Sequence, residues 1–196
     1  MHAVRDGHKF GLRSPKTNEV LREVDARALW QKVLELRLQT GEPYLVFSDS
    51  VNNAMPAHQR ELGLKVRQSN LCSEIMLHTG TDHLGNERTA VCCLSSVNAE
   101  TFLEWRDHPT FIEDVMRFLD NVLQDFIDRA PDAAQTAVYA AMRERSVGLG
   151  LMGFHSFLQS QNVPFESALA KSWNMRMFKH LRREADKASI AIGQEK

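Results

Sequence analysis

The stretch Arg67-Gln-Ser-Asn-Leu-Cys-Ser-Glu-Ile75 carries an amide, a thiol and a carboxylate at every second position. In an extended segment successive side chains alternate between two faces, so Asn70, Cys72 and Glu74 would share one face. Their Cβ atoms would then lie ~7 Å apart, which leaves room for one sugar-sized ligand to touch all three groups. The same spacing also fits a half-buried cysteine beside two solvent-facing polar residues, and spacing alone does not separate these two interpretations.

A second thiol site, with two adjacent cysteines, is Ala90-Val-Cys-Cys-Leu-Ser-Ser-Val97, which also has the composition of a strand. Because adjacent residues of a strand face opposite ways, Cys92 and Cys93 are not expected in one cleft, and one of them is expected to pack. Two cysteines about 20 residues apart on successive strands suit a redox pair or a radical site equally. His78 and His83 lie nearby, but the spacings match no zinc pattern, so no metal site is expected.

The composition is that of an ordinary globular protein, with 43% hydrophobic and 25% charged residues in a chain of 196. One domain with a real core is expected, and intrinsic disorder and collagen are excluded. A balance of 24 Lys and Arg against 25 Asp and Glu predicts no binding to nucleic acid or to a membrane surface. No apolar run approaches the ~20 residues of a membrane-spanning helix, so a cytoplasmic protein with reduced cysteines is expected.

The first half of the chain combines one helix with short extended segments. Asp25 can cap an amphipathic helix, and Gly41 and Pro43 would end it. A short apolar run then predicts a buried strand, and a polar, glycine-containing spacer predicts a turn between two further extended stretches. The helix is expected at about 26–40 and the buried strand at about 43–48. The two extended stretches are expected at about 65–77 and 87–97, with the turn between them at about 78–86.

The second half of the chain is expected to form successive helices. Apolar residues recur at helical spacing between Pro109 and Pro131, and Asp132 can cap the helix that follows. The segment 148–153 matches the GxGxxG string of dinucleotide-binding folds. Because the residues before it are Ala-rich and helical, a turn joining two packed helices is expected there and not a dinucleotide site. The predicted helices lie at about 109–131, 132–145, 150–160 and 166–191, with Pro164 at the last break.

Three separate motifs closely resemble the large catalytic subunit of class I ribonucleotide reductase. They are Arg67–Ile75, Thr89–Asn98 and Arg145–Phe154, and their order and spacing extend the resemblance over about 25–190. The resemblance implies an α/β fold, as part of a ten-stranded α/β barrel in which a finger loop occupies the centre and carries Asn70, Cys72 and Glu74. In this interpretation finger-loop strands precede a helix-rich half, residues 1–24 are unassigned, and 25–196 form a partial barrel domain.

The resemblance also implies a role for each polar residue of the first motif. Cys72 would carry a transient thiyl radical that abstracts the 3′ hydrogen of the substrate ribose, and Glu74 would be the general base at the 3′ hydroxyl. Asn70 would hold the ribose by hydrogen bonds, so that Ser69, Asn70 and Glu74 would form the substrate contacts. Cys92 aligns with the cysteine that helps to reduce the substrate radical and ends as half of a disulfide.

The resemblance implies several partners, and it implies no cofactor that this chain binds directly. A dimetal small subunit would supply the radical, and thioredoxin or glutaredoxin would supply the reducing equivalents. The substrate would be a ribonucleoside diphosphate, reduced to a deoxyribonucleotide for DNA synthesis. ATP and deoxynucleotide effectors would bind regions of the large subunit outside this chain. The chain is therefore expected to be a central fragment that is inactive alone, and Cys93, which matches no catalytic position, is expected to pack.

Two alternatives remain beside this interpretation. The cobalamin-dependent class II reductase shares the barrel and the thiyl chemistry, but class II sequences more often carry proline where this chain has Leu71 after Asn70. This leucine favours class I. The other alternative is a non-catalytic remnant or binding module that keeps the surface of the fold without its reaction.

Overall fold

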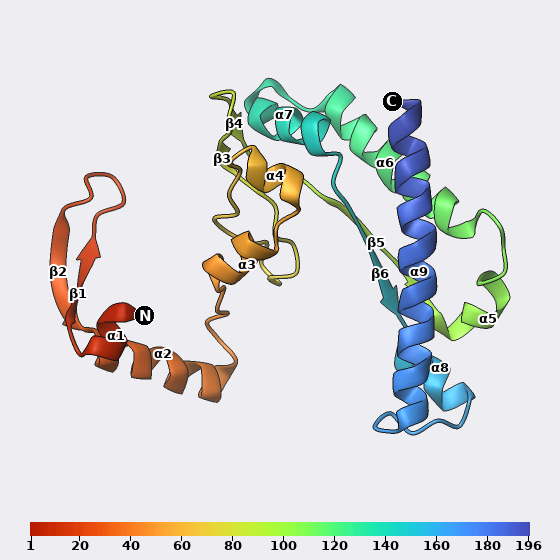
Figure 1. Cartoon of the computed structure of the whole chain (residues 1–196), viewed down its shortest axis with the longest axis horizontal. Coiled ribbons are helices and arrows are strands. Elements are labelled where there is room, and N and C mark those ends of the chain that lie inside the picture. The colour runs from red at the N-terminus through yellow and green to blue at the C-terminus, as the bar shows by residue number, and fades with distance from the viewer.

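The computed structural model describes residues 1–196 and shows an open, curved molecule in three parts (Figure 1). An N-terminal arm stands apart from a middle part of short helices and loops. The remainder of the chain is a parallel pair of strands packed against helices. No helix is long and apolar enough to cross a membrane.

The N-terminal arm consists of an antiparallel β-hairpin and two helices. Their bounds are α1 His2–Asp6, β1 Lys9–Arg13, β2 Val20–Asp25 and α2 Ala26–Thr40. The side chain of Asp25 accepts a hydrogen bond of 2.8 Å from the backbone N–H of Ala28, and Gly41 ends α2 with a φ of 82°. The predicted helix at 26–40 and both of its ends are therefore confirmed.

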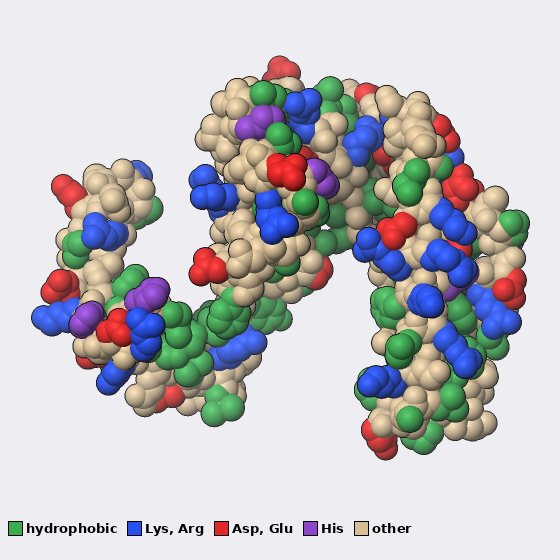
Figure 2. Space-filling view, viewed as in Figure 1, with side chains coloured by type: hydrophobic (Ala, Val, Ile, Leu, Met, Phe, Trp, Pro, Cys, Tyr) green, Lys and Arg blue, Asp and Glu red, His purple; other side chains and the backbone are tan.

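The apolar stripe of α2 is largely exposed in this structure. Leu34 and Leu36 are 44% and 38% exposed, and Ala26 is the one buried residue of the helix. Figure 2 shows hydrophobic side chains at the surface of the arm. The spacing of apolar residues thus predicts the helix correctly without predicting its burial.

The segment 43–48 is not the buried strand that its apolar residues predict. No strand lies between α2 and α3 (Ser48–Ala54), and the side chains of Tyr44 and Phe47 are 51% and 63% exposed. A strand needs a neighbour to pair its backbone groups, and this segment belongs to none of the sheets. Without that neighbour, a short apolar run has no reason to stay extended and buried.

The middle part is held by a small apolar cluster and one amide. Its remaining elements are α4 Ala57–Glu61, β3 Gly80–Thr81 and β4 Glu87–Arg88. Met55, Leu64 and Val66 are buried together. The side-chain amide of Asn52 donates to the Val66 carbonyl and accepts from the Val66 N–H, both at 2.9 Å. Strands β3 and β4 pair around the predicted turn at 78–86, which is thereby confirmed.

The strands β5 (Cys93–Asn98) and β6 (Val147–Met152) run parallel, with Cys93 opposite Val147. A helical crossover joins them, made of η1 Ala99–Thr101, α5 Phe102–Trp105, α6 Phe111–Arg129, η2 Asp132–Ala134 and α7 Gln135–Glu144. A parallel pair with a helical crossover is a βαβ unit, so the α/β class is confirmed. The pair forms a two-stranded sheet by itself, and no barrel closes within residues 1–196.

The glycine-rich segment 148–153 is mostly strand and not the turn between helices that its sequence suggests. Gly148 and Gly150 of β6 lie opposite Leu94 and Ser96 of β5. A Cβ on Gly150 would sit 2.7 Å from the Ser96 hydroxyl oxygen, and one on Gly148 would overlap the Leu94 side chain. The glycines therefore allow the two strands to approach each other closely. No local pattern in the sequence reveals this pairing.

The helices of the second half agree with the predictions in number but not at every end. Helix α6 and the long helix α9 (Ala168–Glu195) are confirmed, with Pro164 in the break before α9. The helix expected at 150–160 begins later, as α8 (Phe154–Ser160), because β6 occupies its first residues. Asp132 makes no side-chain capping bond, since it starts the 3-10 turn η2 and not α7 itself.

The main core lies between one face of the β5–β6 pair and helices α5, α6, α8 and α9. Odd-numbered strand residues such as Val97 and Leu149 join it, and Phe157 and Leu158 are its largest fully buried side chains. On the opposite face the even-numbered Leu94 of β5 is 54% exposed. Strand alternation thus gives the pair one core face and one open face.

Candidate active site

The motif at 67–75 forms a turn and not the extended segment that its alternation suggests. The backbone N–H of Ser73 donates to the Asn70 carbonyl at 3.1 Å, and Ser73 has a φ of 63°. This left-handed residue breaks the alternation of side chains between two faces. The predicted stretch at 65–77 contains no strand at all. Asn70, Cys72 and Glu74 therefore do not share one face through a period of two.

The turn uses one end of the Asn70 amide and leaves the other end for a ligand. The side-chain oxygen of Asn70 accepts a hydrogen bond of 3.0 Å from the backbone N–H of Ile75. The hydroxyl of Ser69 donates to the Asn70 carbonyl, also at 3.0 Å. With its oxygen engaged, Asn70 has its two amide N–H groups left to donate. The side chain is therefore suited to bind a hydroxyl oxygen.

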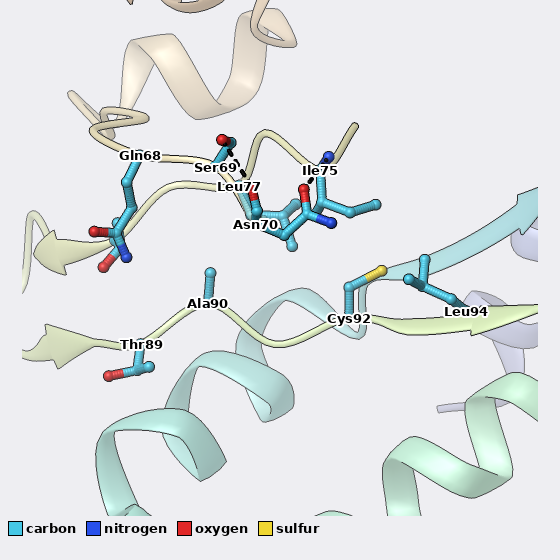
Figure 3. A pocket seen from close by; sticks show the side chains of 10 residues that line it. Gln68, Ser69, Asn70, Ile75, Leu77, Thr89, Ala90, Cys92 and Leu94 are labelled. Atoms are coloured by element: carbon cyan, nitrogen blue, oxygen red, sulfur yellow. Dashed lines mark hydrogen bonds between the residues drawn. The ribbon is translucent and has the colours of Figure 1, made fainter. Parts of the chain in front are cut away.

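A cleft of about 230 Å³ separates this turn from the segment that leads into β5 (Figure 3). Ser69 and Asn70 line one side, and Ala90 and Cys92 line the other. In Figure 3 the Cys92 side chain rises from its segment toward the side on which Asn70 lies. The lining is completed by Gln68, Ile75, Leu77, Thr79, Thr89 and Leu94.

The two adjacent thiols face different sides of the strand pair. Cys92 lines the cleft, whereas Cys93 opens β5 in register with Val147, which packs against the core. Burial raises the pKa of the Cys92 thiol, and Cys93 and the Glu74 carboxylate raise it further. Burial also raises the pKa of Cys93. Cys92 therefore carries its proton at neutral pH, as a hydrogen donor requires.

Glu74 lies beside the cleft and not inside it. It lines an adjoining cleft of about 450 Å³ on the open face of the strand pair. Ile75 and Leu94 line both clefts, so the two are neighbours. The floor of the second cleft includes Gly148 and Gly150, whose lack of side chains keeps it open.

The structure brings together four of the five residues that the sequence singles out. Ser69, Asn70 and Cys92 line the first cleft, and Glu74 lines the second. Cys72 is exposed on the turn and lines neither cleft. A turn in place of the predicted strand explains this difference, because the alternation that would have placed the thiol beside the amide and the carboxylate is lost.

A sequence profile described as ribonucleotide reductase, barrel domain, matches residues 9–196. The chain belongs to this family. The match begins within the segment 1–24, to which the sequence by itself assigns no fold. The barrel membership and the helix-rich half that the three motifs imply are thereby shown, although residues 1–196 form no closed barrel.

Relatives of the family share sequence over most of the chain. A ribonucleoside-diphosphate reductase large subunit of Invertebrate iridescent virus 3 is 42% identical over 95% of this chain and 29% of its own length. The large chain from Schizosaccharomyces pombe is 32% identical over 91% of this chain and 21% of its own length. The class Id ribonucleotide reductase alpha subunit of Actinobacillus ureae superposes with a TM-score of 0.78 at 38% identity, covering 86% of this chain and 32% of that one. The chain spans about a third or less of each.

One group of polar residues, three of them buried, has no place among the sequence-based predictions. It consists of His78, Asp82, Arg88, Tyr139 and Glu144, which we call the Arg88 network. The side chains of Arg88 and Asp82 are 2% and 0% exposed. His78, weighed above as a zinc ligand, instead lies with its Nε2 atom 2.8 Å from Arg88 Nη1. Asp82 and Arg88 flank one turn, which is a local signal, but nothing local connects them to Glu144.

The titration of His78 gives the network a pH dependence. Burial lowers the pKa of His78, and Arg88 lowers it further, against the opposing effects of Glu144 and Asp82. A group whose pKa is lower in the folded than in the unfolded protein contributes stability above the unfolded value of about 6.5. That contribution is lost as the pH falls through 6.5 toward the folded pKa.

We therefore expect the melting temperature of the chain to fall on acidification from pH 7.5 to 5.5, and to fall less in a His78→Gln variant. Thermal melts followed by circular dichroism at several pH values measure both slopes. His83→Gln, at an exposed histidine of the same hairpin, serves as the control and keeps the parent slope. Equal slopes in the parent and in His78→Gln would contradict the assignment.

Proposed function

We propose that this chain is the barrel segment of a class I ribonucleotide reductase large subunit, and that it reduces ribonucleoside diphosphates when the rest of that subunit is present. The observation that carries the proposal is the first cleft. There a protonated thiol, Cys92, faces an amide, Asn70, whose donor groups are free for a ribose hydroxyl. Because the chain belongs to the reductase family, the pair of Cys92 and Asn70 has a specific chemical interpretation, as a hydrogen donor beside a group that binds the ribose.

The proposed reaction assigns each side chain one task. A thiyl radical on Cys72 takes the 3′ hydrogen atom of the ribose, and Glu74 takes the proton of the 3′ hydroxyl. Asn70 donates hydrogen bonds that orient the ribose, and Ser69 supports it from the same turn. The 2′ hydroxyl leaves as water while Cys92 and a second thiol supply two protons and two electrons and become a disulfide. Glu74 then returns its proton to the 3′ oxygen, and Cys72 returns the hydrogen atom to the 3′ carbon, which restores the thiyl radical.

The exposed position of Cys72 adds one requirement to this mechanism. The turn must bring the thiol of Cys72 against the same ribose that Asn70 and Cys92 hold. Packing of the turn inside a closed barrel would exclude water from the radical and fix this geometry. The remainder of the large subunit is therefore proposed to complete the site and not merely to stabilise the fold.

The proposal includes partners of the kinds that the reaction needs. A small subunit with a dimetal centre would supply the radical, and thioredoxin or glutaredoxin would reduce the disulfide. ATP and deoxynucleotide effectors would act through other regions of the large subunit. We propose that the reaction takes place in the cytoplasm, where reductants keep thiols reduced. The class Id identity of the superposed alpha subunit favours class I over the cobalamin-dependent class.

The experiment combines the chain with separately produced N-terminal and C-terminal pieces of a large subunit and with a small radical subunit. We expect conversion of cytidine diphosphate to deoxycytidine diphosphate, and loss of that product when Cys72→Ser replaces the parent, because serine holds no weak S–H bond. Chromatography of the nucleotides measures both. Product that is equal in the parent and in Cys72→Ser, or absent from both, would contradict the proposal and favour a binding module.

A further inference from the structure

The Arg88 network joins the β3–β4 hairpin to the C-terminal end of α7. Arg88 donates from Nε to Asp82 at 2.8 Å and from Nη1 to Glu144 at 2.6 Å. Tyr139 of α7 donates its hydroxyl to the same Asp82 oxygen at 2.9 Å, and its ring lies 5.2 Å from the guanidinium carbon. One planar cation thus holds carboxylates from two elements that are far apart in the sequence.

Both legs of this hairpin continue directly into the first cleft. The hydroxyl of Thr79 donates to the Arg88 carbonyl at 3.0 Å, which ties the two legs together. The N–H of Thr89 donates to the carbonyl of Thr136, in the first turn of α7, at 3.2 Å. The cleft residues that adjoin the hairpin are Leu77 and Thr79 before β3, and Thr89 and Ala90 after β4.

His78 completes the bonding of Arg88 in its neutral form. Because a guanidinium only donates, the Nε2 atom of His78 accepts from Arg88 and its proton lies on Nδ1. This Nδ1 atom is buried and has no partner in the chain. A buried donor without a partner costs free energy, and the hydrogen bond that Nε2 accepts from Arg88 offsets part of this cost.

We propose that Arg88 is a positioning residue that sets the separation between Asn70 and Cys92 across the cleft, an inference that rests on the proposed function of those two residues. Cys92 follows Arg88 by only four positions, and the turn with Asn70 precedes the hairpin on its other leg. Loss of the guanidinium would leave the buried Asp82 and the half-buried Glu144 without their counter-ion. The hairpin would then part from α7, and the cleft would widen and expose the half-buried thiol of Cys92 to more water.

The test measures the reactivity of Cys92 in the 196-residue chain. Cys72→Ser and Cys93→Ser together leave Cys92 as the one thiol of three. In this background we expect Arg88→Ala to raise the rate of iodoacetamide labelling at pH 8 about tenfold, since each unit by which the thiol pKa falls multiplies the thiolate fraction about tenfold. We expect Arg88→Lys to label at an intermediate rate, because one ammonium group does not reproduce the planar fork.

Hydrogen exchange of the same proteins separates positioning from general unfolding. We expect faster exchange at Thr89 and Cys93, whose N–H groups donate to Thr136 and Ser146, with α6 and α9 unchanged. Arg143→Ala is the matched control: Arg143 is exposed on α7 and its guanidinium lies 5.9 Å from the same Tyr139 ring. This control keeps the parent labelling rate.

Two results would overturn the positioning role. One is an unchanged labelling rate in Arg88→Ala. The other is simultaneous opening of α6 and α9, which would make Arg88 a residue of general stability. Because labelling and exchange need no turnover, these results stand apart from the reductase assay. A positive labelling result with no deoxynucleotide product in that assay would contradict the proposed function alone.

Discussion

Mixed with a small radical subunit but with no other part of a large subunit, the 196-residue chain is expected to form no deoxynucleotide above the level of its Cys72→Ser variant. Reduction of a ribose needs two thiols that converge on the same carbon. In this structure Cys92 faces the cleft, Cys93 faces the core and Cys72 is exposed on a turn. The chain therefore presents one thiol, and not two, to a ligand in the cleft.

The expected loss is complete, because an absent catalytic group removes a step of the reaction and does not merely weaken its transition state. The two-stranded sheet of β5 and β6 adds a second reason, since it leaves the clefts open to water that would quench a radical. Chromatography of cytidine nucleotides after long incubation measures the result. Deoxycytidine diphosphate above the Cys72→Ser level would show that the chain holds a radical route and a second thiol of its own.

Gly153→Ala is expected to cause the largest loss of stability among single substitutions of the glycine-rich segment. Gly153 has a φ of 73° at the start of α8, and a left-handed residue with a Cβ costs roughly 1–2 kcal/mol. Its Cβ would also collide with the side-chain oxygen of Asn98, which accepts from the Glu100 N–H at 3.0 Å. Loss of such a cap costs about 1 kcal/mol more.

The melting temperature of Gly153→Ala should therefore fall by about 5–10 °C, given roughly 2–4 °C for each kcal/mol in a chain of this size. Thermal unfolding followed by circular dichroism measures the change. Gly193→Ala provides the matched control, because nothing lies within 4 Å of its Cβ position in α9. That helical site gains up to about 1 kcal/mol from alanine. A Gly153→Ala melting temperature equal to that of the parent would show that neither strain nor collision is present.

Local chemistry in the sequence predicts the features that depend on neighbours in the chain. Asp25 and Gly41 bound α2 because capping needs only the first and last turns of a helix. The opposite directions of Cys92 and Cys93 follow from strand alternation alone. The order of the three motifs likewise indicates the family before any coordinates are considered.

Pairing between distant segments decides the features that the sequence leaves undetermined. The apolar run at 43–48 resembles a strand but has no partner, whereas the glycines of β6 resemble a turn but pair with β5. In both cases the deciding factor is whether another strand supplies hydrogen bonds, and local periodicity contains no information about this.

The candidate site divides in the same way. The sequence of the motif at 67–75 specifies the chemical groups of the site, because an amide, a thiol and a carboxylate have fixed chemistry wherever they lie. Their directions are set by the left-handed turn at Ser73, which sends Cys72 to the surface and Asn70 into a cleft. The distance across that cleft depends on a buried cation and on Glu144, 56 residues away along the chain. Sequence determined the groups, and only tertiary packing decided where they point, because the bond from Arg88 to Glu144 joins two elements that no local pattern relates.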